Sequence, residues 1–300
     1  MLFRSNMIAA KGECEWVTEF SGFLPAKVVL EMIGFPFEDV LLLNFYKEEF
    51  FVHCFSDDPA VRDRVMNESR PKFREYVLEK LEERRNSDDP PKDALTAMLF
   101  GQLAGKPQMT DDEIVRACML LVPAGLDTVA MTLTFMAAHL AQHPEHRRQL
   151  RDNPELIPGA VEEFLRITSV VSPPRKCARD VEVEGRQLHE GDILLVSPSA
   201  AGRDDVEFPD ADQVRFDRSP NRHMAFGLGP HRCLGSSLAR LEMKIALEEM
   251  VKIMPEFSLA PGFEPKLRTG VVLAIEELWL VIGDADAGSE VAAASGSVRG

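Results

Sequence analysis

The sequence has 300 residues, of which 45% are hydrophobic and 28% charged, and its formal net charge is −15. This is the composition of a globular protein with enough apolar residues to enclose a cofactor-sized pocket. The negative charge argues against general affinity for nucleic acid, which requires a basic face, and we expect no nucleic-acid partner.

The cysteines and the apolar segments of the sequence predict the cellular compartment of the protein. The five cysteines are widely spaced, without a CxxC pair or a CxxH zinc spacing, so they indicate no disulfide framework. We find no signal peptide and no apolar run that approaches the eighteen residues of a membrane span. The sequence therefore predicts a soluble protein of the reducing cytoplasm, with no membrane evident.

In chain order, helices come first, then short strands, then a helix. Helical periodicity dominates residues 23–170, with a solvated loop at 86–92, and residues 171–225 carry the alternation and turn signals of strands. We expect residues 7–283 to form one domain. Residues 1–6 have no pattern that we can interpret, and residues 284–300 lack large apolar side chains and are expected to be disordered.

The central feature of the helical region is a long helix that begins at Thr110 and continues to about Leu140. Thr110 and the acidic residues after it form a capping box. Pro123 cannot donate a backbone hydrogen bond, so the helix should loosen where Asp127 and Thr128 place polar groups in an apolar wall. The alternative is two shorter helices that meet at Pro123, with both polar residues in a surface turn.

The next helix carries Glu163 and Arg166, three residues apart on one face. This spacing suits a bidentate bond between guanidinium and carboxylate. Arg218 or His223 is the candidate third member of the pair.

Histidines 139, 143 and 146 are the histidine group whose spacing could suit a metal. Pro144 interrupts the helix between the last two, so we expect that their rings do not converge and that the group is a solvated helix end rather than a zinc site.

Residues 226–235, Phe-Gly-Leu-Gly-Pro-His-Arg-Cys-Leu-Gly, set one cysteine between glycines and the helix predicted over 234–252. Gly227 and Gly229 permit a positive φ and close approach by a flat ligand, and the amides at a helix N-terminus stabilise a thiolate. Cys233 is therefore a candidate metal ligand. The alternative is a buried, unreactive cysteine beside a glycine turn.

The pattern F-G-x-G-x-H-x-C-x-G resembles the haem-binding loop of the cytochrome P-450 superfamily, the haem-thiolate monooxygenases. The resemblance implies that haem b is the cofactor, that Cys233 is the axial ligand of its iron, and that His231 contacts a haem propionate. Phe226, Gly227 and Gly235 are expected to border the haem as parts of the same loop.

Two further motifs resemble the same superfamily. Ala124-Gly125-Leu126-Asp127-Thr128 is similar to its A-G-x-D/E-T motif, which implies that Ala124 and Gly125 widen the helix above the haem. Thr128 would then stabilise iron-bound oxygen, and Asp127 would relay protons to it. Glu163 and Arg166 match the superfamily's E-x-x-R pair, which is structural there.

The resemblance extends to the second propionate ligand and to the partners. Arg175 aligns by spacing with an arginine that pairs a propionate. Dioxygen and an apolar small molecule, terpene-like or aromatic, would be the substrates, and the pocket candidates are residues 170–172 and 271–273. A ferredoxin or flavodoxin, with its reductase, would deliver electrons at a basic patch of four residues, Arg222, Arg232, Arg240 and Lys244.

The predicted fold is thus mainly α with a small β region, the cytochrome P-450 fold. Members of that superfamily are longer, and residues 18–39 look like their mid-chain helix, so we expect the N-terminal third to be missing. Two alternatives stay open: a non-catalytic fragment that binds haem poorly, and a haem protein whose oxidations are driven by peroxide.

Overall fold

The computed structural model describes residues 8, 10–102 and 104–283, so the expectations for residues 1–6 and 284–300 lie outside the described residues. The chain forms two compact units. One, the all-helical unit, comprises Gly22–Asp127, and the other, the mixed unit, comprises the described residues up to Ser21 and from Thr128 onward. The mainly helical class with a small β region is confirmed.

The all-helical unit is built around α7, which packs against α2, α3, α5 and α6. Its core holds fully buried side chains such as Leu30, Phe73 and Ile114, which their helices place on inward faces. The predicted loop at 86–92 joins α5 to α6. The helices of this unit are α2 (Phe23–Ile33), η2 (Phe37–Asp39), α3 (Val40–Phe51), η3 (His53–Phe55), α4 (Pro59–Arg64), η4 (Val65–Ser69), α5 (Arg70–Arg85), α6 (Ala94–Phe100) and α7 (Asp111–Leu126).

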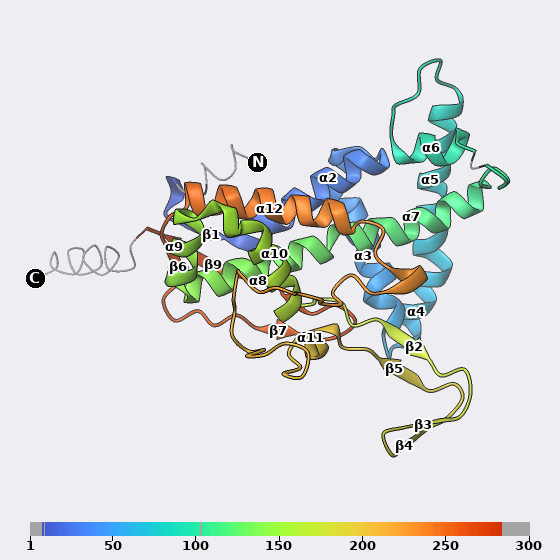
Figure 1. The fold of residues 1–300 in the computed structure, drawn as a ribbon. Coiled ribbons are helices and arrows are strands. Elements are labelled where there is room, and N and C mark those ends of the chain that lie inside the picture. Colours follow the sequence, from blue (N-terminus) through green and yellow to red (C-terminus); the bar gives the residue numbers. More distant parts are fainter. Residues whose placement is uncertain (1–7, 9, 103, 284–300) are drawn as a thin grey trace, which may run out of the picture. The chain divides into compact units, whose positions relative to one another are not determined.

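The mixed unit centres on α12, which packs against α8, α9 and α10 (Figure 1). This packing places the helix that follows Cys233 beside the helix that carries Glu163. The helices of this unit are η1 (Val17–Ser21), α8 (Thr128–Gln142), α9 (Pro144–Asp152), η5 (Pro154–Leu156), α10 (Ile157–Ile167), α11 (Pro198–Ala201), η6 (Gly229–His231) and α12 (Ser236–Ile253).

Short antiparallel sheets complete the mixed unit. Three strands in the order β1-β9-β6 cover one end of α8, with Cys14 opposite Leu280. The pairs β2–β5 and β3–β4 form one arm that extends away from α11 in Figure 1. The strands are β1 (Glu13–Glu15), β2 (Pro174–Lys176), β3 (Val181–Val183), β4 (Arg186–Leu188), β5 (Ile193–Leu195), β6 (Phe257–Leu259), β7 (Leu267–Arg268), β8 (Ala274–Ile275) and β9 (Trp279–Ile282).

The long central helix divides at Asp127. The capping box of Thr110 and Glu113 is confirmed, and α7 continues through Pro123 to Leu126 before α8 begins at Thr128. The amide of Asp127 reaches the Pro123 carbonyl at a long 3.4 Å, so the last turn of α7 is loose. The alternative of a surface turn at Pro123 is wrong, because the break comes four residues later and Asp127 is buried.

Residues 111–142 correct one expectation from the sequence. They contain an eighteen-residue window with a mean hydropathy of 1.6, long and apolar enough to cross a membrane. Buried residues make up 56% of that window. A helix that is largely buried against its own protein is typical of a core helix, and the packing of α7 and α8 within their respective units accounts for its apolar character.

Candidate functional site

The loop that carries Cys233 is closed by one backbone bond. The amide of Cys233 donates to the carbonyl of Phe226 at 2.8 Å, and Gly227 and Gly229 have φ angles of +66° and +68°. These left-handed conformations explain the glycines, as the sequence predicts. The Cys233 side chain is exposed, so the alternative of a buried, unreactive cysteine is wrong.

Gly235 has a different role from the other two loop glycines. Its φ of −84° is open to any residue. A Cβ built at Gly235 would lie 4.0 Å from Sγ of Cys233, in ordinary van der Waals contact. A residue with a Cβ at this position would therefore touch the sulfur without overlapping it.

The segment before the loop is held by Glu163 and Arg166, both fully buried. Arg166 donates to Glu163 through Nε at 2.9 Å and Nη2 at 2.7 Å, and its Nη1 donates to the carbonyls of Gly202 and Ala211. Arg218 also donates to Glu163, at 3.1 Å, so it is the third member of the group. Burial alone would raise the pKa of Glu163, but the hydrogen bonds from Arg166, the Arg215 amide and Arg218 outweigh it and lower that pKa.

The neighbouring Glu162 makes a second anchor that the sequence analysis missed. Arg240 of α12 donates to both carboxylate oxygens of Glu162, at 2.6 and 2.9 Å, and His223 bonds the same carboxylate at 2.9 Å. Burial opposes ionisation of Glu162, yet the bonds to His223 and Arg240 prevail and lower its pKa to about 2. His223, the other candidate for the Glu163 group, therefore belongs to Glu162.

Arg240 also ties this anchor to the cysteine loop. Its guanidinium lies 4.5 Å from the centroid of the Phe226 ring, a cation–π contact. After the bonds to Glu162, the electrostatic attraction of Cys233 is a further cause of the raised pKa of Arg240. Glu162 and Glu163, adjacent on α10, thus hold the loop through two separate networks.

In the all-helical unit, Asp127 pairs with a lysine that the sequence analysis did not single out. Nζ of Lys47, on α3, lies 2.9 Å from Oδ1 of Asp127, and the two side chains are 14% and 11% exposed. Burial would lower the pKa of Lys47, but the attraction of Asp127 and Glu48 is stronger and raises it. Lys47 is therefore charged at neutral pH.

Comparison with known proteins identifies the family to which a chain with these residues belongs. Residues 50–276 match the family model described as Cytochrome P450. The chain belongs to the cytochrome P450 family. The matched range includes all three motifs on which the sequence resemblance rests, residues 124–128, the Glu163–Arg166 pair and the loop of Cys233.

Similar P450 proteins are found in bacteria. Mycinamicin IV hydroxylase/epoxidase of Micromonospora griseorubida is 32% identical over 273 residues, which are 89% of this chain and 67% of that protein. Steroid C26-monooxygenase of Mycolicibacterium smegmatis is 31% identical over 88% of this chain and 65% of that protein. The crystal structure of CYP101J2 matches with a TM-score of 0.82 at 30% identity, over 94% of this chain and 68% of that one. The chain thus spans about two thirds of the length of these P450 relatives.

The residues of the cysteine loop fit a haem. A thiolate sulfur is a suitable axial ligand for haem iron. Beside Cys233, the apolar side chains of Leu228 and Leu234 are 69% and 90% exposed, which suits contact with the edge of an apolar porphyrin. His231 ends the exposed turn η6 of the same loop.

The other candidate P450 residues are distributed over both units. Thr128 and Arg175 belong to the mixed unit. Thr128 begins α8, and Arg175 is exposed on β2. Ala124 and Gly125 lie in α7 of the all-helical unit. A Cβ at Gly125 would come within 2.6 Å of the Val29 side chain. Gly125 therefore lets α7 approach α2 closely, a packing reason that the sequence pattern did not reveal.

The two pocket candidates of the mixed unit lie side by side. Val171 and Val272 form an antiparallel bridge, and the Leu273 amide donates to the Val170 carbonyl at 2.7 Å.

Three members of the predicted basic patch are paired with carboxylates. Arg222 pairs with Glu207, Arg240 with Glu162 and Lys244 with Glu248.

Proposed function

We propose that the chain is the haem-binding part of a bacterial P450 monooxygenase that inserts one oxygen atom into an apolar small molecule. The observation that carries this proposal is the exposed Cys233 thiol, on a loop closed at Phe226 and anchored through Glu162 and Glu163. When bound, haem b with a thiolate ligand supplies the activation of dioxygen, from which one atom enters the substrate and the other leaves as water.

The other candidate residues have separate roles in this proposal. Cys233 would hold the iron, and His231 and Arg175 would bind the haem propionates as a hydrogen-bond donor and a cation. Phe226 and the glycines at 227 and 235 border the haem in this proposal, as do Ala124 and Gly125. Thr128 and Asp127 would pass protons toward the oxygen that leaves as water, with Lys47 holding the carboxylate of Asp127 in place.

Electrons would come from a ferredoxin or flavodoxin in the cytoplasm, supplied by its reductase. Because Glu207, Glu162 and Glu248 offset three of the predicted basic residues, we infer that Arg232 provides the cation that an acidic donor meets at the loop. An Arg232→Gln variant should be reduced more slowly by such a donor, most clearly at low salt. Reduction at an unchanged rate would contradict this assignment.

The activity is tested with isotopic dioxygen. The chain with a ferredoxin, its reductase and NAD(P)H is given ¹⁸O₂ and a panel of apolar terpenes and aromatics. Monooxygenation predicts one ¹⁸O atom per hydroxylated product. Turnover only with added peroxide would favour the peroxide-driven alternative, and a chain that takes up no haem would favour the non-catalytic alternative.

A further inference from the structure

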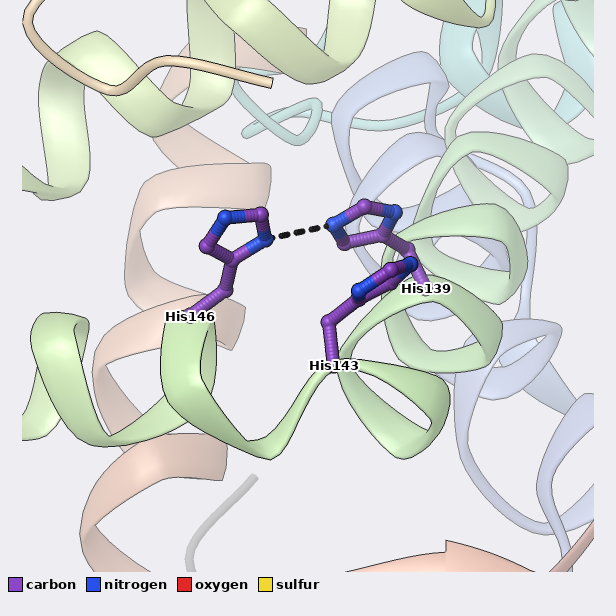
Figure 2. A group of neighbouring side chains, drawn as sticks. All are labelled: His139, His143 and His146. Atoms are coloured by element: carbon purple, nitrogen blue, oxygen red, sulfur yellow. Dashed lines mark hydrogen bonds between the residues drawn. The ribbon is translucent and has the colours of Figure 1, made fainter. Parts of the chain in front are cut away.

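Three imidazoles converge in the mixed unit, away from the cysteine loop in the sequence (Figure 2). His139, His143 and His146 each offer a ring nitrogen, and these three atoms lie within 4.8 Å of one another. Nε2 of His139 is 2.9 Å from Nδ1 of His146, and the rings of His139 and His143 stack with centroids 4.3 Å apart. The expectation that these rings do not converge is wrong.

The helix junction explains the convergence. His139 lies in the last turn of α8, and His143 follows the helix with φ −126° and ψ 74°, which are not helical angles. Pro144 does not merely end α8, because proline suits the first position of a helix and begins α9 here. The chain therefore turns at His143 and brings His146, in the first turn of α9, back over His139.

The surroundings of the cluster hold its rings in place. Phe164 contacts His139 edge to face at 5.3 Å between centroids, and Phe216 contacts His146 at 5.2 Å. Nδ1 of His143 lies 3.0 Å from a carboxylate oxygen of Glu145. A carboxylate on one imidazole nitrogen fixes the tautomer and leaves the other nitrogen as a ligand, the arrangement common around metal-bound histidines.

Two rings of the cluster favour the neutral form, and the third gives access from solvent. Burial, with repulsion from the other two rings, lowers the pKa of His139 to about 4, and burial lowers that of His146 as well. Neutral imidazole is the form that ligates a metal. The His143 side chain is 45% exposed, so an ion and a water molecule can reach the group from solvent.

We propose that His139, His143 and His146 bind one zinc ion, with water as the fourth ligand. Tetrahedral zinc with Zn–N bonds of about 2.0–2.1 Å places its nitrogen ligands roughly 3.3 Å apart. Nε2 of His139 and Nδ1 of His146 are 2.9 Å apart, and one nitrogen from each of the three rings lies within 4.8 Å of the others, so small ring rotations bring the three to that spacing. The ion would link α8 to α9 at the C-terminal end of α8. His139 lies about 16 Å along the helix from Thr128, which begins α8.

Zinc content tests the proposal independently of the haem, because iron is counted separately. After dialysis against micromolar zinc, the chain should retain one zinc per molecule and unfold a few degrees higher than without zinc. His143→Ala should lose both effects. His189→Ala, which removes an exposed histidine of the same unit, should keep them.

A spectroscopic measurement needs no variant. Copper(II) at this site should show hyperfine coupling to imidazole nitrogens in its electron paramagnetic resonance spectrum. Because copper(II) binds nitrogen ligands more tightly than zinc does, only a large excess of zinc should displace it, and magnesium should not displace it at all. Zinc retention by His143→Ala equal to that of the parent chain, or copper with oxygen ligands alone, overturns the proposal. The cluster is then a hydrogen-bonded imidazole pair with a third ring stacked on it.

Discussion

Lys47 and Asp127 form a nearly buried ion pair across 80 positions of sequence, with 2.9 Å between Nζ and Oδ1. The pair joins α3 to the end of α7, where the central helix loosens. The pair thereby holds in place the carboxylate of Asp127, which the A-G-x-D-T motif suggests for proton transfer. Because the pKa of Lys47 is raised, its contribution to stability is present at neutral pH and is lost only as the pH rises above about 10.5.

We predict that Lys47→Met lowers the free energy of unfolding by about 2–4 kcal/mol, because the Asp127 carboxylate is left buried without a cation. The double variant with Asp127→Asn should recover part of this loss, which urea titrations of the single and double variants measure. Lys27→Met removes an exposed helical pair with Glu31 and is the control. Strict additivity of the Lys47 and Asp127 changes would mean that the pair has no coupling.

Glu163→Gln should destabilise the mixed unit by about 3–5 kcal/mol, because it leaves the fully buried Arg166 without its counter-charge. Arg218 and the Arg215 amide lose the same carboxylate. Urea unfolding of the variant measures the effect, with the exposed Glu248→Gln as its matched control. A loss no larger than that of the control would show that the network does not hold the segment before Cys233.

The Glu163 group also shows how far the sequence could predict the site. Glu163 and Arg166 are three residues apart on one helix, so helical periodicity alone places them together. Glu162 and Arg240 are 78 residues apart, and no local spacing signals their contact. The same limit applies to Lys47, whose partner depends on how α3 packs against α7. The convergence of the three histidine rings could not be predicted from the sequence, because a proline suits both the end of one helix and the first residue of the next, and only the fold shows that Pro144 begins α9.

Glu242 predicts a pH dependence of stability. This α12 carboxyl is 5% exposed, and its Oε2 has no hydrogen-bond partner among the described residues. Burial raises its pKa from 4.5 to about 7. The folded state therefore favours the protonated carboxyl of Glu242. As the pH rises from about 4.5 to above 7, this group lowers the free energy of unfolding by an increasing amount, about 3 kcal/mol in full.

We predict that Glu242→Gln stabilises the protein more at pH 8 than at pH 5, since glutamine carries no charge to bury. Urea titrations of the variant and the parent at both pH values measure the difference. Glu248→Gln, an exposed carboxyl on the same helix, should show little pH-dependent change. An equal effect of Glu242→Gln at both pH values would mean that this carboxyl is ionised in the folded protein.

Arg240→Gln should make the haem reduction potential more negative. The guanidinium attracts the charge of the Cys233 thiolate, and a nearby cation favours the reduced, more negative state of the iron. Spectroelectrochemical titration measures the shift, and Lys244→Gln on the same helix is the control. A potential unchanged in Arg240→Gln would show that Arg240 acts only through Glu162 and the loop.

Direct evidence for the axial ligand comes from the absorption spectrum of the reduced, carbon monoxide-bound protein, recorded for the parent chain and for Cys233→Ser. The thiolate assignment predicts a strongly red-shifted Soret band in the parent chain that is absent from the variant. The same band in both proteins, or no haem band in the parent chain after reconstitution, would contradict the assignment of Cys233 as the ligand that holds the haem.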